Sequence, residues 1–167
     1  MNLLALALLP TLASAAPAPA SSGAAVTTPL VQVETVLNDW HDAAAKADFK
    51  RYFWHFADDG IFIGTDPGER WTVEAFKAYA KPYFDKGQAW TLVPKERHVS
   101  FSPDGRTAWF DERVDSPKYG VNRGTGVLYY TEKGGWKIEQ YSYSLPIPND
   151  KFLDVLKLIQ SPAAPKK

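Results

Sequence analysis

The sequence GWKIEQYSYSLPIPND at residues 135–150 carries the clearest strand signal in the chain. Side chains in its first half alternate between two sides: Trp136, Ile138 and Gln140 on one, Lys137 and Glu139 on the other. Such alternation is typical of a half-buried β-strand. Pro146 and Pro148 then end it, because proline has no backbone N–H for a sheet hydrogen bond. We interpret this stretch as the last strand of a sheet with one dry and one wet face.

Three segments upstream also have the composition of strands, with turn signals between them. They are residues 90–101, 107–115 and 121–131. Asp104-Gly105, between the first two, is a strong hairpin signal. Together with the last strand these segments predict a four-stranded antiparallel meander.

Helical periodicity precedes the meander. Thr28 followed by Pro29 is the N-terminal signature of a first helix, and Asp48 and Thr72 are expected to cap a second and a third. Pro82 should kink or end the third helix near residue 80.

Two shorter elements complete the expected order. A strand is predicted at residues 61–63, and an amphipathic helix should begin at Asn149 or Asp150. Helices followed by a meander indicate an α+β fold, with the helices packed on one face of a curved antiparallel sheet.

Composition excludes several classes of function. The 19 basic and 19 acidic residues balance without a long run of either sign, so no nucleic-acid partner is expected. Cysteine is absent, which removes thiol catalysis and thiolate metal sites. The histidines His41, His55 and His98 lack the spacing of a metal-binding helix, and we expect neither a metal nor a cofactor. The six Trp, eight Tyr and nine Phe either build a core or line a cavity.

The amino terminus predicts export. Residues 1–16 combine an apolar run with a small-residue box at Ala13-Ser14-Ala15, as in a secretory signal peptide. A Pro/Ala/Ser spacer at 17–28, one domain at 29–160 and a disordered tail at 161–167 are expected to follow. The sequence therefore predicts a secreted or periplasmic protein without a membrane or lipid anchor.

Strand register suggests which residues share a face. If Asp104-Gly105 form a two-residue loop, Arg97 lies opposite Glu112 on the dry face, and His98 lies opposite Asp111 on the wet face. We expect a four-residue loop at 116–119 to place Glu112 opposite Arg123 as well.

This register predicts a polar cluster above an apolar floor on the dry face. Its expected members are Arg97, Glu112, Arg123, Thr125, Gln140 and Ser142. Between two arginines, Glu112 should stay ionised. The cluster is either a structural ion network or the floor of a site for an anionic ligand. The alternative catalytic pair is His98 with Asp111, a histidine oriented by a carboxylate, and it becomes the candidate if the other sheet face lines the site.

Several blocks resemble the SnoaL-like branch of the nuclear transport factor 2-like superfamily. They include WHDAAAKADFKRYFWHFADDGIFIGTD, SFSPDGRTAWFDE and RGTGVLYYTEKGGWKIEQYS, and the resemblance runs over residues 36–160 or so. It implies a cone-shaped α+β fold, in which a strongly curved antiparallel sheet wraps around the N-terminal helices and leaves a pocket at the open end. Members include ketosteroid isomerases, polyketide cyclases and dehydratases, whose enzymes typically use a pocket Asp or Glu with a His or Tyr. Arg123 and Thr125 fit the Arg-x-Thr strand pattern of such proteins, whereas Ser142 stands where relatives often carry a pocket histidine.

Two functions are compatible with this sequence. One is binding of a small anionic or aromatic molecule between walls at Trp40, Tyr79 and Trp90, with isomerase, cyclase or hydratase chemistry at Glu112. The other is a non-catalytic homodimeric domain that associates through the outer sheet face. That face is expected to carry Trp109, Tyr141 and Tyr143.

Overall fold

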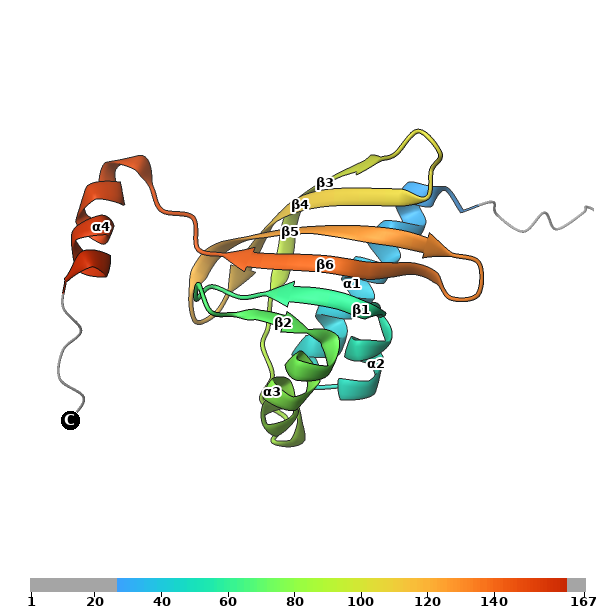
Figure 1. Cartoon of the computed structure of the whole chain (residues 1–167), viewed down its shortest axis with the longest axis horizontal. Coiled ribbons are helices and arrows are strands. Elements are labelled where there is room, and N and C mark those ends of the chain that lie inside the picture. Colours follow the sequence, from blue (N-terminus) through green and yellow to red (C-terminus); the bar gives the residue numbers. More distant parts are fainter. Residues whose placement is uncertain (1–26, 162–167) are drawn as a thin grey trace, which may run out of the picture.

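The computed structural model describes residues 27–161, where helices pack against one curved, unclosed sheet (Figure 1). The helices are α1 (Pro29–Ala45), α2 (Phe49–Trp54), α3 (Val73–Asp85) and α4 (Phe152–Gln160), and a 3-10 turn, η1 (Asn149–Lys151), precedes the last. The strands are β1 (Phe56–Ile63), β2 (Arg70–Thr72), β3 (Val93–Phe101), β4 (Thr107–Ser116), β5 (Gly120–Thr131) and β6 (Gly135–Ser144). The α+β fold class is confirmed. The signal-peptide prediction, nearly all of the spacer and the tail beyond residue 161 lie outside the described residues.

Side-chain caps begin three helices as the sequence predicts. Thr28, Asp48 and Thr72 each accept a hydrogen bond from the backbone N–H three residues later, which satisfies a donor that has no partner within the helix. Of the two effects expected of Pro82, a kink or an end of the helix near residue 80, the end is wrong, because α3 continues through Pro82 to Asp85. Its last turn is held by packing, since buried Phe84 contacts the rings of Phe49, Tyr52 and Trp90.

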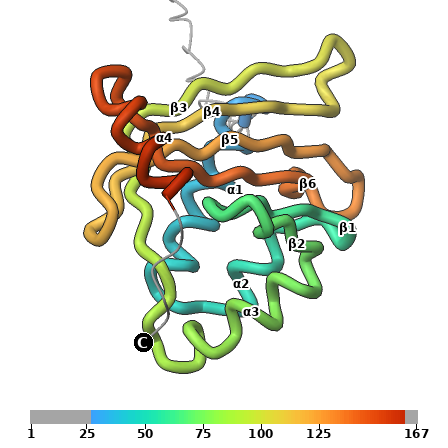
Figure 2. Tube along the Cα trace, turned by 60° about the vertical axis from the view of Figure 1, so that its left-hand side comes forward, coloured from blue at the N-terminus to red at the C-terminus, as the bar shows by residue number. Residues whose placement is uncertain are grey.

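The strand order in the sheet is β2-β1-β6-β5-β4-β3. Strands β3 to β6 form the predicted antiparallel meander. β1 is longer than the strand expected at 61–63 and pairs in parallel with β6, while β2 adds an edge strand that the sequence did not signal. Figure 2 shows α1 crossing the sheet, with α2 and α3 side by side near the β1–β2 edge.

The register of the first hairpin is confirmed, but that of the second is wrong by one residue. Arg97 faces Glu112 and His98 faces Asp111, as predicted. Between β4 and β5, however, Glu112 faces Gly124 and not Arg123. The ladder closes at Ser116–Gly120, and Gly120 has φ of 68°. A three-residue loop followed by a left-handed glycine is a common hairpin type. Because side chains alternate, this slip exchanges the two faces of β5.

An irregularity in the β5–β6 ladder corrects a second expectation. Val127 pairs with Gln140 as predicted, but the register shifts before Leu128, which pairs with Ile138. The shift resets the alternation along β6, so that Ile138 and Tyr141 are both buried. Tyr141 therefore points inward and not to the outer face, and half-buried Tyr143 shares its side of the strand.

Aromatic side chains fill the space between helices and sheet. Trp40 of α1 packs edge-on against Phe56 and Tyr141 and stacks on Tyr52. By contrast, α4 contains no buried residue and stands apart from the domain in Figure 1. The core is thus complete without the last helix.

Candidate functional site

A cavity of about 490 Å³ opens between α3, the β1–β2 hairpin and the loops at 86–92 and 117–119. We call it the aromatic cavity. All three predicted wall residues line it, and they belong to the 11 aromatic residues among its 21 lining residues: Trp40, Tyr52, Phe62, Trp71, Phe76, Tyr79, Tyr83, Trp90, Tyr119, Tyr141 and Tyr143. Its volume lies within the range of small-molecule sites.

Several rings of the aromatic cavity are nearly parallel. Trp71 stacks on Tyr79 at 4.7 Å and on Phe76 at 5.6 Å between centroids, with interplanar angles of 22° and 8°. Phe62 stacks on Phe76 at 4.0 Å. Such walls suit a flat molecule, whose faces can contact aromatic rings over a large area.

Polar atoms without partners also belong to residues of this cavity. Trp40 Nε1, Tyr52 Oη and Tyr143 Oη are buried and make no hydrogen bond within the described part of the chain. Burial raises the pKa of both tyrosines, that of Tyr52 well above its usual value. Both phenols therefore stay protonated at neutral pH and can donate to a bound molecule.

Behind the cavity lies a buried ionic cluster, the Glu112 network. Glu112 Oε1 is 2.7 Å from His41 Nε2 and accepts a hydrogen bond of 3.2 Å from Tyr141 Oη. Glu112 Oε2 accepts two hydrogen bonds from Arg97, at 2.9 Å from Nε and 2.7 Å from Nη2. Arg97 Nη1 also donates to Asn38 Oδ1. The network ties α1 to β3, β4 and β6.

The surroundings of Glu112 favour its carboxylate form. Burial alone would raise the pKa of Glu112, but the hydrogen bonds and charges of His41 and Arg97 outweigh it and lower the pKa below its usual value. The expected ionisation thus agrees with the structure, with His41 in the place given to Arg123. Burial and the Glu112 charge raise the pKa of Tyr141, which therefore remains a neutral donor.

Gly124 makes the contact between Tyr141 and Glu112 possible. A Cβ at this position would overlap Tyr141 Oη and lie 2.9 Å from Glu112 Oε1. Gly126 leaves similar room for the Phe110 ring. The alternating glycines of β5 therefore serve close packing.

Most of the predicted polar cluster is not assembled. Arg97 and Glu112 come together, but Arg123 and Gln140 are exposed on the outer face because of the register slip. Thr125 and Ser142 face each other on that same outer side. The alternative pair is exposed as well, with His98 Nε2 3.3 Å from Glu96 Oε1 and Asp111 on the opposite strand.

Residues that sequence reasoning missed include His41, Tyr52 and Tyr141. His41 follows Leu37 by four residues and precedes Ala44 by three, so it lies on the buried stripe of α1. That spacing was a usable signal. Tyr141 had no such signal, because its inward position depends on the register shift in β6.

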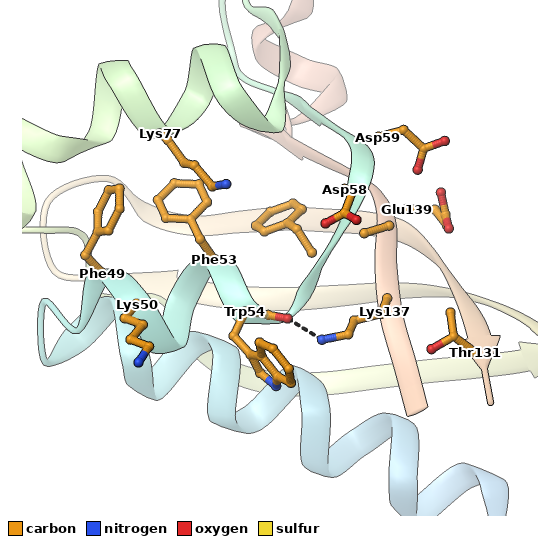
Figure 3. Close-up of a pocket in the computed structure, with 12 residues that line it drawn as sticks. Phe49, Lys50, Phe53, Trp54, Asp58, Asp59, Lys77, Thr131, Lys137 and Glu139 are labelled. Atoms are coloured by element: carbon orange, nitrogen blue, oxygen red, sulfur yellow. Dashed lines mark hydrogen bonds between the residues drawn. The ribbon is translucent and has the colours of Figure 1, made fainter. Parts of the chain in front are cut away.

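A larger and more open groove of about 640 Å³ lies between α2, α3 and the β1–β6 pair (Figure 3). Its rim carries three lysines and three carboxylates: Lys50, Lys77, Lys137, Asp58, Asp59 and Glu139. Lys137 Nζ donates to the Trp54 carbonyl and lies 3.8 Å from the centre of that indole. Among the described residues, none of the unpartnered buried atoms belongs to this groove. The aromatic cavity is therefore the stronger candidate site, although the groove is larger.

Residues 27–161 contain neither a cluster of metal ligands nor a membrane-spanning helix. No group of three or more His, Asp or Glu side chains there is arranged to hold a metal ion. None of the helices described is long and apolar enough to cross a membrane.

The family model of the SnoaL-like domain matches residues 33–148. The match covers more than half of the chain, which therefore belongs to the SnoaL-like domain family, in agreement with the resemblance seen in the sequence. It ends before α4. None of the curated proteins matches this chain.

Solved structures of the nuclear transport factor 2-like (NTF2-like) class share the fold. An NTF2-like protein of unknown function from Pseudomonas putida KT2440 is 14% identical, with a TM-score of 0.58 over 72% of this chain and 88% of that one. A proposed dehydratase of the NTF2-like family from Streptomyces avermitilis is 18% identical, with a TM-score of 0.57 over 72% and 97%. A proposed ketosteroid isomerase from Shewanella frigidimarina NCIMB 400 is 17% identical, with a TM-score of 0.52 over 68% and 94%. At these identities the likeness shows the fold alone.

Proposed function

We propose that this SnoaL-like domain binds a small, flat and uncharged aromatic molecule in the aromatic cavity. The observation that carries the proposal is a cavity of about 490 Å³ whose stacked walls surround polar groups without partners. Apolar walls with a few convergent polar groups are typical of small-molecule sites.

Charge argues against the anionic ligand suggested by the sequence. An anionic ligand would need a net positive charge, in which the two positive charges of Arg97 and Arg123 outnumber the single negative charge of Glu112. Arg97 is instead engaged in two hydrogen bonds with Glu112, and Arg123 is exposed on the outer face. The two arginines therefore supply no excess positive charge to the cavity, which favours a neutral ligand.

The geometry supports acid–base chemistry less well than binding. Glu112 does not line the cavity and reaches it only through Tyr141. An ionised carboxylate held by Arg97 and His41 is a poor general acid. A proton-transfer reaction of the isomerase, cyclase or hydratase type would have to pass through Tyr141 Oη, whose pKa is raised. Binding is therefore the function that the geometry supports best.

A thermal-shift screen tests this function. The panel contains neutral planar compounds, such as naphthalene and fluorene derivatives, and matched carboxylates such as 2-naphthoate. A ligand at a hundredfold excess over its dissociation constant stabilises the protein by about 2.7 kcal/mol. We expect neutral compounds to stabilise the wild type and the groove variant Trp54→Ala, but not the cavity variant Trp90→Ala. A flat screen, or equal shifts in both variants, would contradict the proposal.

A second candidate function is association with a second copy through α4. Phe152, Leu153, Leu158 and Ile159 are 54% to 74% exposed, and no residue of α4 is buried. A nine-residue helix is marginal in isolation and needs a packing partner. Pro146 and Pro148 stiffen the linker, and Pro148 has φ −55° and ψ 139°. Because the linker holds α4 away from its own domain (Figure 1), we propose that a second copy covers the helix in a homodimer. The dimer was first expected at an outer face carrying Tyr141 and Tyr143, which the structure turns inward.

We also propose export of the chain to the periplasm or the medium. Support comes from the apolar run and small-residue box at residues 1–16. Intact-mass analysis of the protein from its native host should show a mature chain that begins after Ala15 or Ala16, without an added lipid. A retained Met1 would contradict export by this route.

A further inference from the structure

The groove between α2, α3 and the β1–β6 pair has an apolar floor (Figure 3). Phe53 and Phe56 of this floor are buried, and half-buried Phe49 lies against Phe53 with ring centroids 4.7 Å apart. Trp54 also lines the groove and is 66% exposed. Its indole is held in place, because Lys137 Nζ lies over the ring and donates to the Trp54 carbonyl. An exposed tryptophan fixed beside an apolar floor is typical of an anchor residue in a protein interface.

The strand side of this groove is acidic. Asp58 and Asp59 of β1 line it together with Glu139 of β6 (Figure 3). Burial and the like charge of Asp59 raise the pKa of Glu139, and no basic side chain in the described part of the chain opposes this rise. The groove therefore favours a partner segment that is apolar in its centre and carries positive charge beside it.

The C-terminal segment of the chain has this polarity and charge. Four apolar residues of α4 recur at the spacing of an amphipathic helix: Phe152, Val155, Leu156 and Ile159. Residues 150–167 contain four lysines but only two aspartates. A helix that places such a stripe into an apolar groove is a recurring mode of recognition. α4 and the groove are thus complementary surfaces, each without a partner within the described chain.

The groove and the α4 of the same chain lie toward opposite ends of β6 (Figure 1). Lys137 and Glu139 are near the start of this strand, whereas the linker to α4 leaves its end at Ser144. About 17 Å of strand separates Glu139 from Ser144. To reach its own groove, α4 would need the linker to reverse its direction, and Pro146 and Pro148 restrict this reversal. A second copy can present its α4 without such a reversal.

Resting on the homodimer proposed above, we propose that α4 of one copy docks into the groove of the other. The apolar stripe of α4 packs on the phenylalanine floor and against Trp54. Basic residues of the C-terminal segment approach Asp59 and Glu139. Two-fold symmetry repeats the contact, so each copy provides one helix and receives one. The family match ends at residue 148, so this contact requires a segment of the chain that lies outside the matched domain.

Sedimentation equilibrium of full-chain variants tests the docking site, with a matched substitution on the outer sheet face for each. Trp54→Ala should raise the dimer dissociation constant at least about tenfold, because the dimer loses two anchors. Trp109→Ala should leave it unchanged. Both tryptophans are largely exposed, at 66% and 48%, so neither variant should lose its fold.

Charge reversal provides a second, independent measurement. Asp59→Lys should raise the dissociation constant about tenfold, or about 1.4 kcal/mol, because a weak exposed charge contact occurs twice in a symmetric dimer. Asp111→Lys makes the same change of charge on the outer face and should have no effect. Asp59 and Asp111 are both exposed.

A mixture of two variants tests whether the contact is reciprocal. Leu158→Glu disables the helix and keeps the groove, whereas Trp54→Ala disables the groove and keeps the helix. Neither variant should dimerise alone at a concentration at which the wild type does. A mixed pair retains one intact contact, so the equimolar mixture should associate more strongly than either component. A mixture no more associated than its components would contradict docking in the groove.

The remaining outcomes separate this inference from the homodimer on which it rests. If Leu158→Glu dissociates the dimer but Trp54→Ala and Asp59→Lys do not, the α4 homodimer stands and the groove is not its docking site. Equal weakening by Trp54→Ala and Trp109→Ala would likewise overturn the groove. A dimer that Leu158→Glu leaves intact, or a full chain that is monomeric at all concentrations, would remove both proposals.

Discussion

Tyr141 Oη of β6 donates a hydrogen bond of 3.2 Å to Glu112 Oε1 of β4, across the intervening strand β5. Tyr141 is also a wall of the aromatic cavity. One phenol therefore separates the buried ionic cluster from the aromatic cavity. The contact depends on a glycine in β5 and on the register shift in β6, so the backbone of three strands determines it.

Glu112→Gln should strongly destabilise the fold. The substitution leaves the buried guanidinium of Arg97 without its charge partner, and breaking a buried ion pair from one side costs about 3 to 5 kcal/mol. Chemical denaturation measures this loss. The control is Asp111→Asn on the exposed face of the same strand, which should change the free energy of unfolding by less than about 0.5 kcal/mol. A loss below about 1 kcal/mol for Glu112→Gln would mean that the pair behaves as a surface pair.

Gly124→Ala should be destabilising because its Cβ overlaps Tyr141 Oη. Overpacking of this kind costs about 1 to 3 kcal/mol. In a Tyr141→Phe background the hydroxyl is gone, so the same substitution should cost at least about 0.5 kcal/mol less. A double-mutant cycle by denaturation measures this coupling. Strictly additive effects would contradict the close contact at Gly124.

Stability should fall as the pH is lowered through the usual range of histidine, and His55 should be a principal cause. Burial lowers the pKa of His55 in the folded state, and the hydrogen bond and charge of Asp39 only partly offset this. The unfolded chain, with a histidine pKa of about 6.5, then binds the proton more readily, so the free energy of unfolding decreases as the pH falls below about 7. The pKa of Glu112 is lowered in the folded state. Its contribution to stability is therefore lost only at lower pH, where carboxylates take up protons. Denaturation curves between about pH 8 and pH 5.5 should be flatter for His55→Gln than for wild type. Equal slopes for the two proteins would rule out this assignment.

Local signals predicted the parts of the fold that depend on few residues. The caps at Thr28, Asp48 and Thr72 need only one side chain and the following turn, and all three are present. The register of the first hairpin was also correct because the turn is centred on Asp104-Gly105, but its loop spans residues 103–106 and not the two residues expected. The helices, the meander and the resemblance were therefore sufficient for the fold class.

The candidate site could not be predicted in the same way, because it depends on single-residue shifts in strand register. Gly120 shortens one loop, and this turns Arg123 outward. The shift before Leu128 turns Tyr141 inward. Neither event changes the hydrophobic pattern enough to be recognised from the strand sequences. Contacts between distant segments, such as His41 with Glu112, depend on the three-dimensional arrangement and follow only once the register is known.

Removal of α4 should convert a homodimer into a monomer. The exposed apolar residues of α4 need a covering surface, and the linker holds the helix away from its own domain. A chain ending at Pro148, where the family match also ends, retains every buried residue of the described structure. It should therefore fold with a thermal stability that no longer depends on protein concentration. Sedimentation equilibrium of the full chain and of the shortened chain measures the change in mass.

Two point variants separate α4 from the outer sheet face as the dimer contact. Leu158→Glu places a charge on the exposed side of α4, and Trp109→Glu places one on the outer face of β4, where Trp109 is 48% exposed. Burial of a charge in an interface opposes association, so Leu158→Glu should dissociate the dimer and Trp109→Glu should leave it intact. The reverse result would assign the dimer to the sheet face. A full chain that is monomeric at all concentrations would contradict self-association, and α4 would then require a different partner.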